Sequence, residues 1–221
     1  MPAIVQYWDS AIAPALIEER MSGWRQTHAN CSYLRFDRES AAAWFFQAFG
    51  LSCQVSFLDV RIPAMQADIF RVAYLLTCGG IWVDAGTICK APFTNWLDST
   101  SPLLLLRRSH QVHPEVCSAF IYAALPDHPL LKMAWSRISS LLYIRGGHKL
   151  YQQFGPGVFR DLIATGDYQN NIEIISVDNL ASFLTIGSSR EATHGDQHWS
   201  IRKGSESLYF SQSSPSTQSG S

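Results

Sequence analysis

The feature that most restricts the fold of this chain is a regular alternation of short, apolar, β-rich runs with longer helical segments. Runs such as "AIVQYW" and "CSYLRFD" are each followed by a segment with helical periodicity, and this order continues to "IEIISV". Such an order predicts an α/β fold in which helices cover a mainly parallel sheet. In sheets of this kind, ligands bind beyond the carboxyl ends of the strands.

The turn and cap residues place the expected elements along the chain. Gly50 closes one predicted helix, and Asp127 with Pro129 begins another, since Asp is a frequent N-cap and Pro is tolerated in a first turn. The expected helices cover residues 13–28, 39–50, 65–80, 127–144 and 155–166, and the expected strands cover residues 3–8, 31–37, 80–86, 102–108, 118–125 and 172–177.

Length and composition predict one folded domain with a polar tail. The chain has 221 residues, 47% of them hydrophobic, which is enough for one sizeable core over residues 1–203. Residues 204–221 are rich in Ser, Gln and Gly, and we expect them to be disordered because they offer little apolar surface to bury.

Charge and cysteine usage exclude several classes of function. The net charge of −1 provides no basic field for DNA or RNA. The five cysteines lack zinc-ligand spacing, which is typical of free thiols in a reducing compartment. No secretory signal precedes the first strand, and no apolar run is long enough to span a bilayer. We therefore expect a cytoplasmic protein, and peripheral contact with the inner face of a membrane stays open.

The stretch "QADIFRVAYLLTCGGIWVDAGTICKAPF" concentrates charge beside apolar residues. Asp68 and Arg71 stand three residues apart in a predicted helix and share one face, either as a local ion pair or as part of a site. Gly79 and Gly80 then close the helix and turn the chain into an apolar strand. Asp84 falls at the carboxyl end of that strand, where it either caps a turn or faces a ligand.

This stretch resembles the sugar-binding core of the DXD-containing glycosyltransferases. That family includes yeast initiating mannosyltransferases, capsular polysaccharide transferases and, more distantly, the clostridial glucosylating toxins. Its pattern is an A-x-D-x-x-R helix, a Gly-Gly turn and an aromatic-x-Asp-x-Asp strand end. The resemblance extends over roughly residues 3 to 200 and also includes "AIVQYWDSAIAPALIEERMSGWRQTHANCSYLRFD", "SAFIYAALPDHPLL", "FGPGVFRDLI" and "HGDQHWS".

The resemblance implies a GT-A type, Rossmann-like α/β domain that takes a UDP- or GDP-sugar as donor. Such an enzyme would move a hexose to a glycan or polysaccharide acceptor with retention of configuration. Asp68 would accept hydrogen bonds from sugar hydroxyls, Arg71 would bind the sugar or the diphosphate, and Asp84 would face the ribose and the metal. The other residues of the implied donor site are Gln6, Trp8 against the base, Gly80 of the Gly-Gly turn, and Trp199 over the leaving diphosphate.

One departure from the family pattern concerns the metal. Gly86 stands where the second Asp of the DXD element would coordinate Mn²⁺ or Mg²⁺. These hard cations need several oxygen ligands, which diphosphate and water partly supply. Asp84 is the remaining carboxylate, and the resemblance nominates three residues near the carboxyl end to complete the set. They are His194, Asp196 and His198.

Two other classes of function compete with an active transferase. A non-catalytic protein that binds sugar nucleotides would keep the fold after losing the carboxylate at position 86. A nicotinamide-dependent oxidoreductase shares the α/β order, but it would need G-x-G-x-x-G after the first strand, and "QYWDSAIAP" does not contain it.

Overall fold

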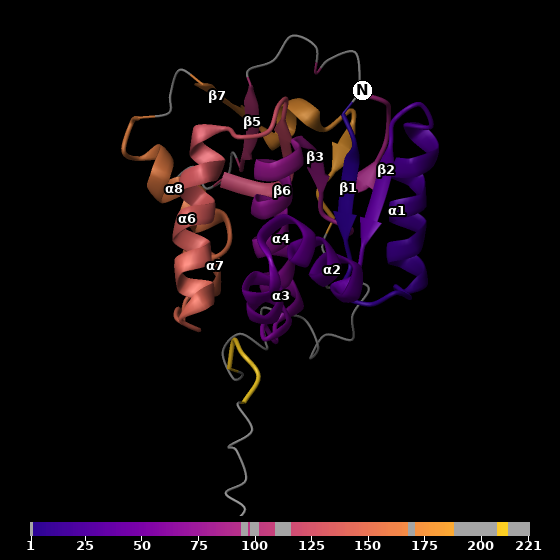
Figure 1. Cartoon of the computed structure of the whole chain (residues 1–221). Coiled ribbons are helices and arrows are strands. Elements are labelled where there is room, and N and C mark those ends of the chain that lie inside the picture. The colour runs from indigo at the N-terminus through magenta and orange to yellow at the C-terminus, as the bar shows by residue number, and fades with distance from the viewer. Residues whose placement is uncertain are drawn as a thin grey trace, which may run out of the picture.

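The computed structural model describes residues 2–93, 97, 102–108, 116–167, 171–187 and 207–211, and it is built around a central sheet (Figure 1). The strand order is β2-β1-β3-β6-β5-β7. The β1–β2, β1–β3 and β5–β7 pairs are parallel, while β6 runs antiparallel to both β3 and β5. The predicted mainly parallel α/β sheet is therefore confirmed. Its strands are β1 (Ile4–Tyr7), β2 (Tyr33–Phe36), β3 (Gly80–Val83), β5 (Leu103–Arg107), β6 (Val116–Ala123) and β7 (Ile172–Ser176).

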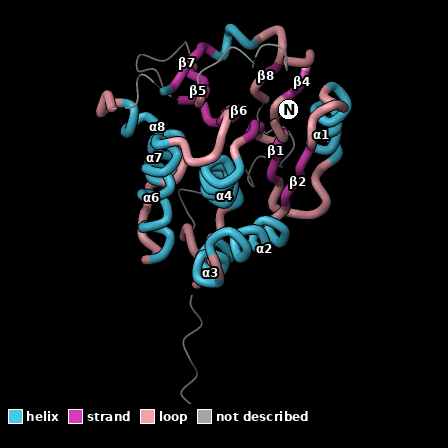
Figure 2. The backbone as a smooth tube through the Cα atoms, turned by 45° about the horizontal axis from the view of Figure 1, so that its top comes forward, coloured by secondary structure: helices cyan, strands magenta, loops and turns pink. Residues whose placement is uncertain are grey.

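Different elements cover the two faces of the sheet (Figures 1 and 2). On one face lie α2 (Arg38–Phe49), α3 (Leu51–Leu58), α4 (Pro63–Cys78), α6 (Pro129–Tyr143), α7 (Leu150–Gln153) and α8 (Pro156–Ile163). On the other lie α1 (Ala15–Thr27), the 3-10 helix η2 (Val177–Leu180) and a two-stranded sheet of β4 (Ile88–Cys89) and β8 (Leu184–Thr185). In the part of the chain that the structure describes, no helix combines the length and the apolarity that a bilayer crossing requires.

The alternation of side chains along the strands divides the core into two parts. Val5 and Trp82 point to the face that carries α4, whereas Ile4, Ile81 and Val83 point to the face that carries α1. This follows from the two-residue period of a strand, which sends successive side chains to opposite faces. Both sets are buried, so the central strands read as continuous apolar runs in the sequence.

Helix α4 positions the stretch that the sequence singled out. Pro63 occupies its first turn, where a missing backbone N–H is harmless, and Gly79 ends it with a φ of 66°. Gly80 follows with a φ of 101°, and a β-carbon there would lie 2.8 Å from the carbonyl oxygen of Ala3. Both glycines are thus required by backbone geometry, and they return the chain antiparallel to α4 as strand β3.

Two expectations about local structure are wrong. The cap of α6 is His128, whose Nδ1 accepts a hydrogen bond from the backbone N–H of Leu130, while Asp127 has a positive φ of 66° before the helix. The prediction of a disordered tail fails for residues 207–211, because Leu208 and Tyr209 are buried. The polar composition of the tail gave the wrong prediction for these residues, because two buried apolar side chains are enough to pack an otherwise polar segment against the domain. The domain boundary at residue 203 stays a prediction.

Candidate functional site

An ion pair within α4 forms the centre of the candidate site. The Nη2 atom of Arg71 lies 2.5 Å from Oδ1 of Asp68, and the two side chains are only 4% and 10% exposed. The pair is one turn apart on a helix that is otherwise apolar, so neither group can turn to bulk water. The sequence did not decide between a solvated ion pair and part of a site. The burial of both side chains excludes a solvated ion pair.

Asp84 joins the pair from the end of β3. Its Oδ1 lies 3.5 Å from Nη2 of Arg71 and accepts a 2.8 Å hydrogen bond from the indole N–H of Trp82. The side chain of Asp84 is 39% exposed, in contrast to its two partners. Asp84 is therefore the member of this carboxylate–arginine–carboxylate cluster that a ligand can reach most directly.

The guanidinium of Arg71 is held on several sides by protein groups. Its Nη1 donates to the carbonyl oxygen of Ser118 on β6, and its central carbon lies 5.2 Å from the centroid of the Trp82 ring. Its Nε has no hydrogen-bond partner among the described residues. In this arrangement Arg71 connects α4, β3 and β6, and it fixes the two carboxylates relative to each other.

Burial dominates the electrostatics of Asp68. Removal from water disfavours the charged carboxylate and raises the pKa of Asp68 to about 7, an effect that the nearby Asp84 charge reinforces and the Arg71 guanidinium opposes. The proton equilibrium of this carboxyl group therefore lies near neutral pH. Small changes in its surroundings will shift its protonation state.

The start of α8 encloses the other side of Asp68. A β-carbon added to Gly155 would lie 2.8 Å from Oδ2 of Asp68, so the glycine leaves the space that this carboxylate occupies. The sequence analysis noted the "FGPGVFRDLI" segment but gave Gly155 no part in the site. Its glycine next to a proline was the available signal, but a sequence alone does not show which turn approaches α4.

Trp8 lies beside the turn that follows Asp84. It is half-buried and packs against a small apolar cluster that contains Ile17, Met21 and Ala85. Because Ala85 comes directly after Asp84, this contact brings Trp8 to the same end of the sheet as the carboxylates. Gln6 is fully buried on β1, and its Oε1 accepts a 2.7 Å hydrogen bond from the hydroxyl of Tyr33.

Hydrogen bonds within the Asp84–Thr87 turn and from helix α1 hold the backbone of this turn in place. The N–H of Thr87 donates to the carbonyl oxygen of Asp84 at 2.9 Å. Arg20 donates to the carbonyl oxygen of Gly86 at 3.1 Å, and the indole of Trp24 donates to that of Thr87 at 2.8 Å. Two side chains of α1 therefore fix the backbone that presents the Asp84 carboxylate.

Some of the predicted site residues do not join this cluster. Gly80 lies at the amino end of β3, packed on the backbone of Ala3, whereas Asp84 follows its carboxyl end, so we withdraw its assignment to the donor site. Four further predicted residues lie outside the described part of the chain: His194, Asp196, His198 and Trp199. Within the described part, no group of three or more His, Cys, Asp or Glu side chains is arranged to hold a metal ion.

Sheet order and site geometry together define an α/β protein of the GT-A type, with its charged cluster at the carboxyl end of β3. The fold assignment also rests on the solved structure titled PaToxG glycosyltransferase, which has a TM-score of 0.55 and 16% sequence identity and covers 82% of this chain and 71% of that one. The chain belongs to the capsular polysaccharide synthesis protein family, whose sequence profile matches residues 4–190.

Two further proteins are also similar to this chain. An initiation-specific alpha-1,6-mannosyltransferase of Schizosaccharomyces pombe is 24% identical over 186 residues, which cover 72% of this chain and 46% of the relative. The chain thus spans just under half the length of that curated relative. A glycosyltransferase involved in the glycosylation of the major capsid of PBCV-1 has a TM-score of 0.48 and 11% identity, covering 86% of this chain and 96% of that one.

Proposed function

We propose that this protein is a retaining glycosyltransferase that moves a hexose from a UDP- or GDP-sugar to a glycan or polysaccharide acceptor. The observation that carries the proposal is the convergence of Asp68, Arg71 and Asp84 at the carboxyl end of β3. Open α/β sheets bind their ligands at this edge. Membership of the capsular polysaccharide synthesis family supports the same reaction class.

The three residues differ in how far a donor can reach them, and this suggests different roles. Asp84 is the most exposed and would contact the ribose, while Asp68 would accept hydrogen bonds from sugar hydroxyls through its small exposed part. Arg71 is enclosed by Asp68, Ser118 and Trp82. We therefore assign Arg71 mainly to positioning the carboxylates, and to adding positive potential where the diphosphate would lie.

The nucleotide would lie along the end of β1. Trp8 is half-buried beside Ala85, and the exposed part of its indole would stack on the base. Stacking on an indole contributes about 1–3 kcal/mol in nucleic-acid binders. Gln6 lies two residues before Trp8 and is fully buried. It would support this segment and would not contact the base itself.

A divalent cation, Mn²⁺ or Mg²⁺, is part of the proposal. Asp84 is the one carboxylate of the DXD-like turn, so the protein would supply few ligands there and the donor diphosphate would supply others. A bound cation would offset the negative charge that builds up on the leaving diphosphate.

The chemistry needs little from the protein beyond positioning and charge. The bond between the anomeric carbon and the diphosphate oxygen breaks, and its electron pair leaves with the diphosphate. The acceptor hydroxyl forms the new bond on the same face and passes its proton to the departing phosphate oxygen. Asp68 and Asp84 would hold the sugar and the ribose so that this geometry exists before the bond breaks. No protein base is assigned.

The test is a donor panel with the full chain. Each common UDP- and GDP-hexose is incubated with Mn²⁺ or with EDTA, and sugar release or transfer is measured beside calorimetric binding of UDP and GDP. We expect turnover with one donor class, its loss in Asp84→Ala, and a changed donor preference in Asp68→Ala. Turnover that survives in Asp84→Ala would overturn the assigned site.

A second candidate is a non-catalytic protein that binds sugar nucleotides. The observation in its favour is Gly86, which removes the second carboxylate of the DXD element. The same panel separates the two proposals, because binding of UDP or GDP without turnover of any donor would favour this alternative.

A further inference from the structure

The proposed reaction does not use a segment rich in Lys and Arg that lies beside α4 on the same face of the sheet. From His128 through Arg160 the sequence contains five Lys or Arg residues and no Asp or Glu, although the net charge of the whole chain is −1. This segment comprises α6, the turn that follows it, α7 and the first half of α8. Lys132, Arg145 and Arg160 each pair with a carboxylate outside this stretch, namely Asp127, Asp59 and Asp161. Among the described residues, the cations of this stretch that form no ion pair are therefore Arg137 and Lys149.

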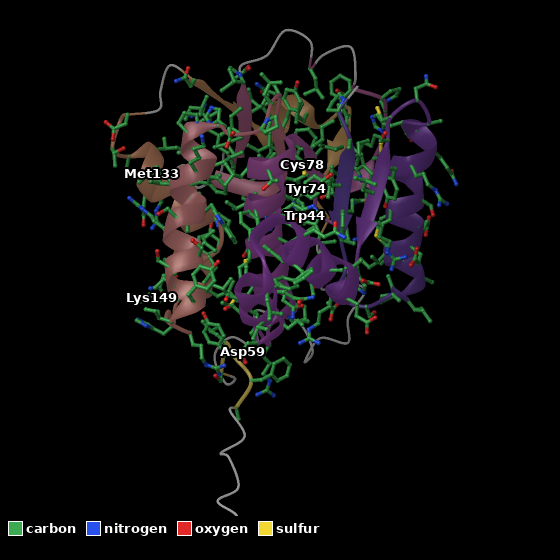
Figure 3. The ribbon with its side chains drawn as sticks, in the orientation of Figure 1. Trp44, Asp59, Tyr74, Cys78, Met133 and Lys149 are labelled. Carbon is green, nitrogen blue, oxygen red and sulfur yellow. The ribbon has the colours of Figure 1, made fainter. Side chains whose placement is uncertain are left out.

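The outer side of α6 combines these cations with exposed apolar side chains. Met133, Arg137, Ser140 and Ile144 follow one another at helical spacing and are all exposed, while the opposite side of the helix packs in the core. Ile144 is 74% exposed. We call the following set the α6–α7 face: Met133, Arg137, Tyr143, Ile144, His148 and Lys149. Figure 3 shows Met133 and Lys149 along the same outer edge of the molecule.

Further exposed apolar side chains lie on α3, across a hollow whose lining also includes the paired Asp59 and Arg145. Val55 and Tyr143 line an open hollow of about 420 Å³ between these two helices. Leu51 lies one turn before Val55 on the same side of α3, and both are exposed. Exposed apolar groups that adjoin one another in this way usually mark a surface that contacts something other than water.

We propose that the α6–α7 face docks peripherally on an anionic lipid bilayer. Lys and Arg side chains are attracted to anionic headgroups, and exposed Ile, Met and Tyr side chains can enter the headgroup boundary. A soluble polyanion would leave Ile144 and Tyr143 without a role. A second copy docked face to face would bring the same cations against each other.

The fold links this surface to the candidate site by orientation. The N–H of Asp127 bonds to the carbonyl oxygen of Leu76, so α6 begins beside the end of α4 and runs back along it. Since β3 also runs antiparallel to α4, the last turn of α6 lies toward the same end of the molecule as the carboxyl end of β3, which Asp84 follows in the chain (Figure 1). The Ile144–Lys149 end of the α6–α7 face is therefore the end that lies toward the candidate site.

Flotation of the full chain with lipid vesicles tests this proposal without any measurement of sugar transfer. We expect binding to vesicles of phosphatidylglycerol mixed with phosphatidylcholine, weak binding to phosphatidylcholine alone, and loss of binding at high salt. Arg137→Gln and Lys149→Gln should each weaken partitioning about fivefold. Ile144→Ser should weaken it through the apolar contribution.

Leu125→Ser is the matched control, because Leu125 is 71% exposed and lies before α6, outside the α6–α7 face. Circular dichroism checks that each variant is folded. Three results would overturn the proposal: equal binding to both kinds of vesicle, an equal loss in Leu125→Ser, or light scattering that reveals a dimer dispersed by Ile144→Ser. The last result would assign the face to a second copy of the chain.

Discussion

Gly155 at the start of α8 lies directly against Asp68 on α4, so closely that a β-carbon on the glycine would come within 2.8 Å of Oδ2 of the carboxylate. Two segments far apart in the sequence therefore share one wall of the candidate site. The backbone of Gly155 has a φ of −99°, which any residue can adopt. The need for glycine here comes from the space that Asp68 occupies.

Gly155→Ala should therefore impair the site more than the fold. The added methyl group must push the Asp68 carboxylate away from its position beside Arg71, and misplacement by a fraction of an ångström at a reacting centre costs on the order of tenfold in rate. We expect kcat/KM for sugar transfer to fall by about that factor. Steady-state kinetics with the preferred donor measures it.

Gly23→Ala is the control for this substitution. Gly23 lies within α1, and a β-carbon there would have no neighbour within 4 Å. Alanine in a helix interior stabilises by up to about 1 kcal/mol relative to glycine, so this variant should transfer sugar normally and unfold at the same or a higher temperature. Equal rates for Gly155→Ala and Gly23→Ala would contradict the contact between Gly155 and Asp68.

Arg71→Met should destabilise the protein strongly, and a second substitution should restore much of the loss. Removing the guanidinium leaves the buried Asp68 carboxylate without its 2.5 Å partner, and breaking a buried pair in this way costs about 3–5 kcal/mol. In Asp68→Asn/Arg71→Met no charge remains at position 68. Urea unfolding of the two single variants and the double variant measures the coupling, and additive losses would argue against a buried pair.

The pKa of Asp68 predicts how stability changes with pH. The folded pKa is about 7, against an ordinary value of 3.8. Between these values the folded chain retains a proton that the unfolded chain has released, so the contribution of Asp68 to the free energy of unfolding falls as the pH rises from about 4 to 7. In Asp68→Asn this contribution should disappear. Urea midpoints of both proteins across this range test it, and parallel curves would show that Asp68 titrates normally.

Sequence patterns predicted the order of elements well, because burial imposes the periods on which they depend. The alternation of apolar runs gave the sheet-forming segments, and the Gly79–Gly80 pair gave the end of α4. The second helix was predicted to end at Gly50, as it does, but the start of α3 at Leu51 was missed. Leu51 and Val55 are exposed, so α3 lacks the clear amphipathic pattern that identifies a helix.

The sequence singled out Asp68, Arg71 and Asp84, which the structure brings together, but it did not show how they are arranged. The spacing of Asp68 and Arg71 predicted that they share one helical face. The position of Asp84 after a strand predicted that it lies where α/β sheets bind ligands. What spacing does not reveal is that Arg71 also reaches Ser118 on β6, or that Gly155 closes the other side. Those contacts depend on how α4 and α8 pack on the sheet, and no local pattern encodes that packing.

His128 predicts a loss of stability in mild acid. Its Nδ1 accepts from Leu130 N–H at 3.2 Å and its Nε2 donates to the carbonyl oxygen of Asn171 at 2.9 Å, an arrangement that requires the neutral ring. Burial lowers the pKa of His128. The unfolded chain therefore takes up a proton first as the pH falls below about 6.5, and the contribution of His128 to the free energy of unfolding decreases.

His128→Asn tests this assignment. Asparagine is a good N-cap but does not titrate, so the variant should keep the start of α6 while losing this part of the acid dependence. The measurement is the urea midpoint from pH 7 down to pH 5 for both proteins. An unchanged slope in the variant would mean that another group causes the acid sensitivity.

The packed segment at residues 207–211 predicts that Tyr209 stabilises the whole domain. Tyr209 forms an isolated antiparallel bridge with Val60, its hydroxyl donates to the carbonyl oxygen of Gly146 at 2.9 Å, and the guanidinium of Arg145 lies 5.3 Å from its ring centroid. Arg145 is in turn paired with Asp59. One aromatic side chain thus joins the turn after α3 to the turn after α6.

Two substitutions at Tyr209 separate these contributions. Tyr209→Phe removes only the hydroxyl and should cost about 1 kcal/mol, whereas Tyr209→Ala also removes the buried ring and should cost about 3–5 kcal/mol. Phe210→Ala is the control, because Phe210 is exposed at the adjacent position and should change stability much less. Urea unfolding followed by tryptophan fluorescence measures all three. If Tyr209→Ala were as stable as Phe210→Ala, residues 207–211 would contribute nothing to the folded domain, and the predicted disordered tail would then describe them correctly.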